Sequence, residues 1–333
     1  MKNKKNIIPL IILPTVAILW AAFFILFKND FLNKYYFMPF LGILAATVAN
    51  TTPAAAGIVY FPILTKLQIA PIMAARYNLM IQAYGMGLGT LKWYLVNKKL
   101  FLLKVIPACI LGGFIGCFFS IVIFPLENPK VLQLIFSIFA FILVQFVFFS
   151  ILREHKYPNN DVKLNLANFS ILFFLSLIGG LISGWIGFGI DTIFYFILTI
   201  IFRINPAVSI ITSISLMTGV SIFGTALNII FKEIPLALWY SAIPGVTLAG
   251  LFIASFLALK LGTRNILLLF TLFLSLDFFL TIWQSDTIAI STIAKFIITH
   301  ALVLYLLIIH IKIFRMSYTK IKENLGEFKE SSS

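Results

Sequence analysis

Charged residues are scarce in this sequence, and acidic residues are the scarcer kind. Only 11% of the 333 residues are charged, whereas 61% are hydrophobic and the mean hydropathy is +1.05. This composition excludes an ordinary soluble domain and is typical of an all-α polytopic membrane protein. The 25 lysines and arginines outnumber the 11 acidic residues, but they lie mostly in short loops and tails. We therefore interpret the charge of +14 as a determinant of topology and expect no nucleic-acid partner.

Residues that bind metals or form disulfides are also rare. The two cysteines, Cys109 and Cys117, fall on one expected helix about 12 Å apart along its axis, which is too far for them to pair. The three histidines are scattered, so we expect no metal and no cofactor. The sequence has no phosphate-binding P-loop, no His-Glu-x-x-His helix and no Gly-x-Ser-x-Gly elbow, which argues against direct use of ATP and against common hydrolases.

Long apolar segments are abundant. Residues 7–27 are long enough to span a membrane and lack a clear cleavage site, so we expect a retained helix rather than a signal peptide. Further apolar segments cover about 37–66, 71–96, 101–124, 130–152, 167–202, 206–231, 236–259, 264–283 and 289–314. Two of these, 37–66 and 167–202, far exceed the roughly 20 residues of one span and are interrupted near their middles. Each is either a long broken helix or a re-entrant hairpin that enters and leaves on the same side.

The distribution of lysine and arginine favours the hairpins. If all ten segments cross with the N-terminus inside, the two sides carry 13 and ten basic residues. If 37–66 and 167–202 are hairpins with arms of about 13 residues, 18 basic residues lie inside and five outside. The positive-inside rule therefore prefers about eight full spans with two hairpins over ten spans.

Two hairpins that dip from opposite faces, each followed by three crossing helices, form an inverted repeat, which is the construction of many secondary transporters. A weak internal match supports the repeat, since an offset of 135 aligns Pro71 with Pro206 and Asn78 with Ser213. We divide the chain into an N-terminal helix with its loop (1–36), a first repeat (37–152), a cytoplasmic linker (153–166), a second repeat (167–285), a C-terminal helix (286–314) and a polar tail (315–333).

The stretch from Gly179 to Asp191 carries five glycines in the middle of the second long segment. Lipid forbids irregular backbone at this depth unless protein or a water-filled cavity surrounds it. A helix that stops and restarts here presents N–H groups that suit an anion. The candidate ligand contacts are the Ser183 hydroxyl and the backbone at Gly184, Gly187 and Gly189. Close helix packing through small residues is the alternative.

The interruption of the first long segment offers one amide and two hydroxyls. Asn50, Thr51 and Thr52 precede Pro53, which is well placed to begin the second arm of a hairpin. We interpret the three polar side chains as substrate contacts at the tip of this hairpin. Helix capping is an equally good interpretation of the two threonines.

A polar stripe follows Pro71 along one face of the next helix. Asn78 and Gln82 are candidates for lining a cavity, while Gly85 and Gly89 on the same face favour close packing. In the second half, Thr212 and Ser213 supply hydroxyls at a similar depth, although such hydroxyls often bond back to their own helix.

Two charged residues are candidates for handling ions. Arg76 lies about 7 Å into its segment, where it either snorkels to the interface or attracts anions at a cavity mouth. Asp191 and Asp277 are the only acidic residues placed deep in segments. Asp191 adjoins the glycine-rich stretch, so we interpret it as the carrier of a coupling proton or the partner of a cation.

Three stretches together resemble the TauE/SafE family of sulfite exporter-like permeases. They are Ser183-Gly184-Trp185-Ile186-Gly187-Phe188-Gly189, its first-half counterpart from Ala45 to Gly57 leading to Phe61-Pro62, and Pro206-Ala207-Val208 followed by Thr212-Ser213. The resemblance covers roughly residues 37 to 285 and implies a bacterial or archaeal inner-membrane permease for sulfur-containing anions such as sulfite or sulfonates. The first half carries Thr51 to Ala56 where relatives tend to have more glycine, which bears on the substrate more than on the fold.

We therefore expect a secondary transporter that moves a small, sulfur-containing anion by alternating access, with H⁺ as a candidate coupling ion and both termini in the cytoplasm. The anion, the direction of movement and the oligomeric state are left unspecified. One alternative is an intramembrane aspartyl-type enzyme that pairs Asp191 with Asp277. The other is a membrane scaffold or channel that is not a carrier.

Overall fold

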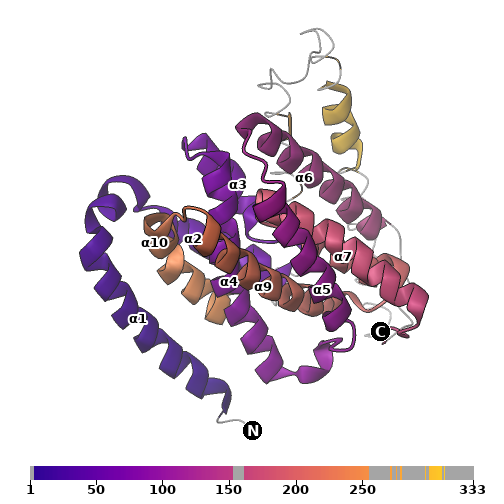
Figure 1. Ribbon diagram of the computed structural model, residues 1–333, viewed down its shortest axis with the longest axis horizontal. Coiled ribbons are helices and arrows are strands. Elements are labelled where there is room, and N and C mark those ends of the chain that lie inside the picture. The colour runs from indigo at the N-terminus through magenta and orange to yellow at the C-terminus, as the bar shows by residue number, and fades with distance from the viewer. Residues whose placement is uncertain are drawn as a thin grey trace, which may run out of the picture. The chain divides into compact units, whose positions relative to one another are not determined.

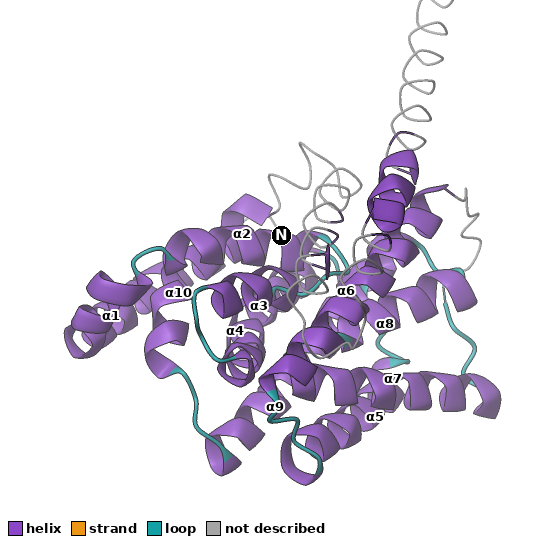
Figure 2. Cartoon of the chain, turned by 90° about the horizontal axis from the view of Figure 1, so that it is seen from above, coloured by secondary structure: helices purple, strands orange, loops and turns teal. Residues whose placement is uncertain are grey.

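The computed structural model describes residues 4–152 and 161–254, together with residues 271, 275, 278, 279, 297, 300–309 and 311. Every element that these residues form is a helix, which confirms the predicted all-α class (Figure 1, Figure 2). Much of the predicted segments 264–283 and 289–314, including Asp277, lies outside the described residues.

Ten α-helices follow one another in residues 4–152 and 161–254, and a further apolar helix covers His300–Ile309. The ten are α1 (Lys4–Asp30), α2 (Met38–Thr51), α3 (Gly57–Lys66), α4 (Pro71–Val96), α5 (Ile106–Phe118), α6 (Pro129–Leu152), α7 (Leu166–Ile186), α8 (Ile190–Phe196), α9 (Pro206–Phe231) and α10 (Leu236–Leu248). Short π-helical segments continue four of them, namely η1 (Phe31–Tyr35), η3 (Phe119–Ile123), η4 (Ile197–Ile201) and η5 (Ala249–Ile253), and η2 (Lys98–Leu100) is a 3₁₀ turn.

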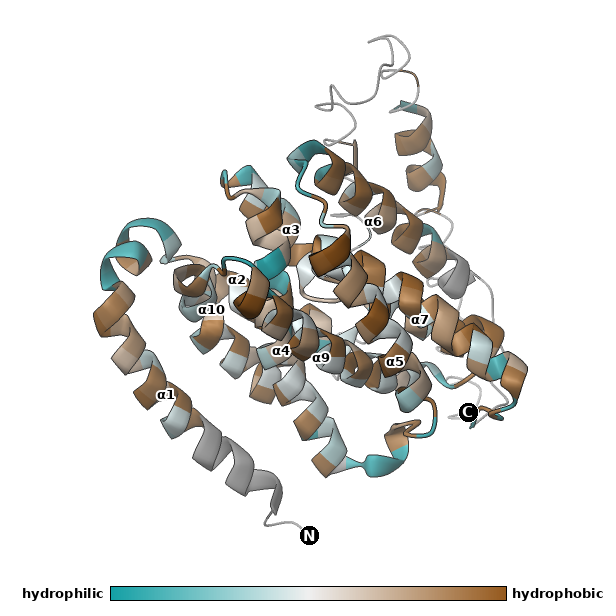
Figure 3. Ribbon diagram, in the orientation of Figure 1, coloured by the Kyte–Doolittle hydropathy of each residue, from teal (hydrophilic) through white to brown (hydrophobic). Residues whose placement is uncertain are grey.

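The helices have the length and surface of membrane spans. Six helices of the described residues, counted with their π-helical continuations, are long and apolar enough to cross a bilayer. Hydrophobic residues dominate their ribbons (Figure 3), and large apolar side chains are exposed on them, among them Ile25 and Leu166, which are 78% and 83% exposed. Because lipid is the apolar solvent that such faces require, the chain is an integral membrane protein.

The chain groups into two compact units. The first comprises Met1–Phe136 and Lys156–Phe270, and the second comprises Ser137–His155 and Thr271–Ser333. Within the second unit, Phe141 stacks on Phe278 with ring centroids 4.3 Å apart. All candidate site residues lie in the first unit, to which the rest of the description refers.

The order of elements in the first unit repeats itself. Helices α4 and α9 both have 26 residues and both begin with proline at the first helical position, which tolerates the missing N–H group. Helix α5 with η3 (Ile106–Ile123) and helix α10 with η5 (Leu236–Ile253) both have 18 residues, and each pair passes from α- to π-helix at the same point. Each half also contains a broken segment, α2–α3 or α7–α8.

The two halves exchange partners when they pack. Helix α2 lies against α10 of the other half, α7 lies against α5, and α4 and α9 lie between these two pairs (Figure 1, Figure 2). Both outer contacts depend on glycine, because a Cβ on Gly180 would lie 2.8 Å from the Cα of Gly113 and one on Gly42 would lie 2.9 Å from the Ala242 carbonyl oxygen. A reciprocal exchange of this kind is what a twofold relation between the halves produces.

One contact between loops decides how the segment 167–202 lies. Lys232, just after α9, lies 3.8 Å from Glu127, which precedes α6. If the segment 167–202 crossed the membrane, three crossings would separate these residues and put them on opposite sides. Because the two residues are in contact, the structure favours the hairpin over the ten-span alternative, and the topology stays a prediction.

The first arm of this hairpin is longer than expected. Helix α7 has 21 residues rather than about 13, because Gly179, Gly180 and Gly184 stay within the helix and it ends only at Ile186. Asn165 caps its start by accepting a 2.8 Å hydrogen bond from the Asn168 N–H group. Nearby, Lys104 donates a 2.6 Å hydrogen bond to Asp161. This hydrogen bond lowers the pKa of the Asp161 carboxyl and joins the loop before α5 to the loop before α7.

Candidate functional site

The break in the second hairpin, which we call break 2, runs from Gly187 to Gly189. Helix α7 ends at Ile186 because Gly187 adopts the left-handed conformation at φ 84°, and Gly189 follows at φ 137°. The Ser183 hydroxyl accepts a 3.0 Å hydrogen bond from the N–H group of Ile190, the first residue of α8. The predicted stop and restart of the helix are therefore confirmed, and the Ser183 hydroxyl stabilises the break.

The five glycines divide between the two roles considered from the sequence. Gly187 and Gly189 have the positive φ angles that make the break. Gly179 packs against Ile190, Gly180 against Gly113 and Gly184 against the Ser120 side chain, so all three serve helix packing.

The break in the first hairpin, break 1, lies between Thr51 and Gly57. The Thr51 hydroxyl donates to the Thr47 carbonyl at 2.8 Å, and the Thr52 hydroxyl donates to the Val48 carbonyl at 2.9 Å. The Ala54 N–H group in turn donates to the Thr52 hydroxyl at 3.2 Å. Both threonines therefore satisfy backbone groups at the end of α2, as the capping interpretation predicts.

Two side-chain amides of α4 hold break 2 in place. Asn78 Nδ2 donates to the Ile186 carbonyl at 3.2 Å, and Gln82 Nε2 donates to the Gly187 carbonyl at 2.8 Å. Carbonyls at the end of a helix have no partner within it, and these two find one on α4. Both amides are fully buried, and their oxygens, Asn78 Oδ1 and Gln82 Oε1, have no hydrogen-bond partner among the described residues.

The two breaks meet each other directly. Thr192 Oγ1 donates a 2.9 Å hydrogen bond to the carbonyl of Pro53, which joins the start of α8 to the middle of break 1. A Cβ on Gly57 would lie 2.6 Å from the Phe188 ring and 3.0 Å from Asn78 Nδ2. The first unit therefore gathers both breaks and the polar stripe of α4 at one place.

A small cavity lies beside this junction, and we call it the inner cavity. Its space, open solvent included, is about 190 Å³, and it is lined by Ala46, Ala49, Asn50, Ala56, Tyr60, Ile81, Gln82, Gly85, Met86 and Val246. Asn50 Nδ2 donates to the Ala46 carbonyl at 2.8 Å. The remaining polar atoms of the lining side chains, Asn50 Oδ1, Gln82 Oε1 and the Tyr60 hydroxyl, are buried without a partner among the described residues. Gly85, which belongs to the polar stripe of α4, leaves room for this cavity because it has no side chain.

Asp191 is buried at the start of α8 and is 1% exposed. It occupies the first turn of this helix, where the helix dipole favours a negative side chain. Its Oδ1 atom has no hydrogen-bond partner among the described residues, and no described lysine or arginine pairs with the carboxylate. Asp277, its partner in the enzyme hypothesis, lies outside the described residues.

Thr212 and Ser213 serve α9 rather than the junction. The Thr212 hydroxyl donates to the Val208 carbonyl at 2.7 Å and accepts from the Leu102 N–H group at 3.1 Å, while the Ser213 hydroxyl donates to the Ile210 carbonyl at 2.8 Å. The sequence offered two interpretations of these hydroxyls, substrate contact and hydrogen bonds back to their own helix, and the structure shows hydrogen bonds of the second kind. Ser213 aligns with Asn78 in the sequence repeat, but its hydroxyl is too short to reach across as an amide does.

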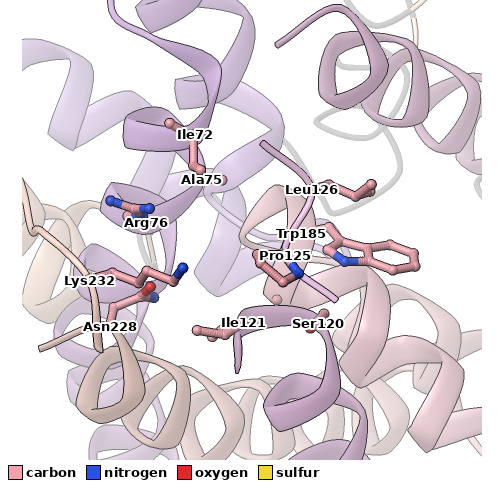
Figure 4. A pocket seen from close by; sticks show the side chains of 11 residues that line it. Ile72, Ala75, Arg76, Ser120, Ile121, Pro125, Leu126, Trp185, Asn228 and Lys232 are labelled. Carbon is pink, nitrogen blue, oxygen red and sulfur yellow. The ribbon is translucent and has the colours of Figure 1, made fainter. Parts of the chain in front are cut away.

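Arg76 lines a second, open pocket on the far side of break 2, which we call the vestibule (Figure 4). The vestibule has a volume of about 300 Å³ and is lined by Ile72, Ala75, Arg76, Ser120, Ile121, Pro125, Leu126, Gly184, Trp185, Asn228 and Lys232. Arg76 Nη1 donates to the backbone carbonyl of Glu233 at 3.1 Å. The guanidinium therefore lies at a cavity mouth, one of the two positions considered from the sequence.

The sequence patterns did not indicate Thr192, Tyr60 and Lys232 as residues of these cavities. Thr192 follows Asp191 directly, and this position next to the glycine-rich stretch is the sequence signal that could have identified it as a site residue. Tyr60 and Lys232 gave no such signal, because only the packing of α3 and the end of α9 brings them to the cavities.

Comparison with known proteins agrees with this architecture. Residues 38–278 match the family described as Sulfite exporter TauE/SafE, and this range contains both breaks, α4 and α9. No curated protein and no solved structure matches the chain. The family match covers well over half of the sequence and confirms the resemblance seen in its motifs, so the protein belongs to the Sulfite exporter TauE/SafE family of membrane transporters.

Proposed function

We propose that the protein is a secondary transporter that moves a small, sulfur-containing anion, such as sulfite or a sulfonate, by alternating access. Membership of a family named for sulfite export supports transport and the choice of anion. The excess of basic residues predicted on one side supports a bacterial cytoplasmic membrane with both termini in the cytoplasm.

The observation that carries the proposal is the pair of hydrogen bonds from Asn78 and Gln82 to break 2. Both amides donate to backbone carbonyls at the end of α7. The oxygens of an oxyanion accept the same kind of hydrogen bond. When break 2 moves away from α4, the two amides become free donors in a buried place, and an anion replaces the carbonyls.

The structure described here is then the closed state. The Thr192 to Pro53 hydrogen bond and the two amides hold the breaks together, and the inner cavity is too small for more than a few atoms. Rocking of the pair α2 and α10 against the pair α5 and α7 would widen the inner cavity on one side of the junction and the vestibule on the other. Exchange of partners between the halves suits such a motion, because α2 moves with α10 and α7 moves with α5.

Asp191 is the proposed proton carrier. Its carboxylate lies next to break 2 and is buried without a basic partner among the described residues, so a proton on it is held or released according to the opening of the break. An anion that arrives together with this proton adds no net charge to the buried site, which lowers the cost of desolvation.

Uptake into proteoliposomes tests the function. The purified chain is reconstituted, and uptake of labelled sulfite and sulfoacetate is measured with and without a pH gradient. We expect uptake that saturates and that accelerates when unlabelled anion is present inside, because a carrier exchanges its ligand. A channel would give flux that neither saturates nor exchanges. Absence of flux for every sulfur-containing anion would contradict the proposal.

A further inference from the structure

The inner cavity is lined by neutral oxygen atoms. Among the residues that the structure describes, no charged side chain, histidine or cysteine lines it. Its polar side chains belong to Asn50 of α2, Tyr60 of α3 and Gln82 of α4. The ligands that zinc and calcium prefer are therefore missing from its walls. The Tyr60 hydroxyl lies near that of Tyr77, which leaves the two amide oxygens as the open acceptors.

The orientation of the two amides follows from the hydrogen bonds that they donate. Asn50 Nδ2 donates to the Ala46 carbonyl and Gln82 Nε2 donates to the Gly187 carbonyl, each at 2.8 Å. A carbonyl can only accept, so neither amide can be turned over without losing its hydrogen bond. Asn50 Oδ1 and Gln82 Oε1 are left without a donor in the described part of the chain. A buried acceptor in this state is destabilising, and a bound ligand removes the penalty.

The negative end of a helix lies at the same cavity. Ala46, Ala49 and Asn50 line the cavity from the last two turns of α2. The intrahelical donor for the Ala49 carbonyl would be the N–H group of residue 53, but Pro53 has none. The partial negative charge at the end of a helix attracts a cation. The helix end and the amide oxygens therefore favour the same kind of ligand.

Two glycines of α4 keep space around these oxygens. Gly85 lines the inner cavity, and Gly89 follows one turn later on the same face of the helix. A Cβ atom on Gly89 would overlap with Asn50 Oδ1, so any larger residue would displace this oxygen. Glycine leaves only its Cα hydrogens near the oxygen, and these are weak donors. Asn50 Oδ1 therefore keeps a lone pair for a stronger ligand.

We propose that the inner cavity is a sodium site, with Asn50 Oδ1, Gln82 Oε1 and the Ala49 carbonyl as ligands and water at the remaining positions. A single water molecule has two hydrogens to donate and brings no charge to the helix end, whereas Na⁺ interacts with all three oxygens at once. Because no described carboxylate lines the cavity, a monovalent cation is favoured over a divalent one. The small volume favours Na⁺ over the larger K⁺.

The ion connects the two breaks through one amide. Gln82 binds it through Oε1 while Nε2 of the same side chain holds the Gly187 carbonyl of break 2. Asn50 lies at the end of α2, just before break 1. A cation on the oxygen polarises the amide, which strengthens the hydrogen bond from its N–H group. Na⁺ therefore stabilises the junction of the breaks, whichever molecule the chain carries.

Thermal unfolding measures the site without transport. Melting temperatures of the full chain in nanodiscs are recorded in NaCl, KCl and choline chloride at one ionic strength, and binding of labelled Na⁺ is measured on the same samples. We expect one saturable Na⁺ site per chain from which excess K⁺ does not displace the label. The melting temperature should rise by about 3–5 °C at a Na⁺ concentration about tenfold above the dissociation constant, and KCl should give no such rise.

Variants at Asn50 test the assignment of the ligands. Asn50→Ala removes one ligand, but the Ala46 carbonyl keeps the backbone N–H group of residue 50 as its helical donor. We expect a folded protein whose melting temperature no longer responds to Na⁺. Asn50→Asp keeps an oxygen and adds a negative charge, so it should bind Na⁺ about tenfold more tightly.

Asn228→Ala is the matched control. Asn228 is a buried asparagine of α9 whose Nδ2 donates to the carbonyl four residues earlier, at 3.0 Å, as Asn50 does in α2. It does not line the inner cavity, so its replacement should leave the response to Na⁺ unchanged.

Three results would overturn the sodium site: stabilisation by Na⁺ no greater than by K⁺ or choline, an unchanged Na⁺ response in Asn50→Ala, or an equal loss of the response in Asn228→Ala. The first would show that water alone fills the cavity. The second, together with loss of the response in Asp191→Asn, would place the cation at the buried carboxylate instead. Uptake of sulfite is a separate measurement, and its presence or absence leaves the sodium site unaffected.

Discussion

Thr192 donates a 2.9 Å hydrogen bond to the carbonyl of Pro53, across 139 residues of sequence. The donor follows the glycine break of the second half, and the acceptor lies within the break of the first half. Proline gives its residue a fixed φ and leaves its own carbonyl available, and the interruption of the helix leaves that carbonyl without an intrahelical partner. This single bond therefore ties together the two interruptions on which transport would depend.

Replacing the donor should weaken the closed state. Thr192→Val keeps the shape of the side chain but removes the hydroxyl, so a buried carbonyl loses its partner at a cost of about 1 kcal/mol or more. We expect a melting temperature lower by about 2–4 °C and slower uptake of labelled sulfite. Thr199→Val is the control, because Thr199 is buried in the same hairpin but donates to its own helix at Tyr195. Equal effects of the two variants would show that the link between the breaks has no special role.

The amides of α4 are expected to matter for both stability and transport. Asn78→Leu and Gln82→Leu each leave one carbonyl of break 2 unpaired, which costs about 1–3 kcal/mol, and each removes a proposed anion donor. We expect folded variants that melt earlier and do not take up sulfite at a measurable rate. Ser170→Ala, at an exposed serine that bonds to its own helix, should behave as the parent protein does. Unchanged uptake in both amide variants would rule out their role as donors.

Gly187 is the glycine that the fold tolerates least well as alanine. At φ 84° a Cβ atom costs about 1–2 kcal/mol, and here it would also clash with the Ala75 carbonyl oxygen and with Asn78. We expect Gly187→Ala to lower the melting temperature clearly and to abolish uptake. Gly87→Ala should be neutral or slightly stabilising, because its Cβ would meet only Thr218 at 3.7 Å and alanine favours the helix. Thermal unfolding of the two variants side by side gives the comparison, and equal melting temperatures would contradict it.

Asp191 should control coupling rather than folding. Asp191→Asn removes the titratable group and keeps the size of the side chain, so we expect a folded protein whose uptake no longer responds to a pH gradient. Asp161→Asn is the control at an exposed carboxylate outside the candidate site. Uptake by Asp191→Asn at the parental rate with the parental pH dependence would exclude the residue as the proton carrier.

The arrangement of the hairpins predicts which loops share a side of the membrane. In a background without Cys109 and Cys117, both of which are buried, single cysteines replace Glu127, Lys232 and Lys99 in turn. An impermeant maleimide added to intact cells should label the cysteines at positions 127 and 232 and should not label the one at position 99. Labelling of positions 127 and 232 from opposite sides would contradict the contact between Lys232 and Glu127.

Much of the fold could be predicted because lipid imposes strong constraints on sequence. The bounds of α4 and α9 agree with the apolar segments that begin at Pro71 and Pro206, since proline and polar residues end a span visibly. Both breaks lie where glycine, proline and polar residues interrupt an apolar run. The late end of α7 could not be foreseen, because Gly179, Gly180 and Gly184 stay within the helix, where their lack of a side chain serves close packing rather than a break.

The site was harder to predict than the fold. The residue types at Asn50, Asn78, Gln82, Ser183 and Asp191 indicated a polar junction, and the structure brings their elements together. The sequence did not show which of these polar atoms are already hydrogen-bonded. Thr51, Thr52 and Ser183 bond to nearby backbone groups, and only the structure shows these bonds. The residues that line the vestibule come from four distant stretches and are brought together only by the packing of α4, η3, α7 and α9.

The exchange of partners between the halves also sets the order of assembly during synthesis. Helix α2 enters the membrane early, but its partner α10 begins only at Leu236. At about 5–20 residues per second, the ribosome needs on the order of 10–40 s to reach that point. For this time the face of α2 that packs on α10 has no permanent neighbour in the bilayer, and a truncated first half could never acquire one.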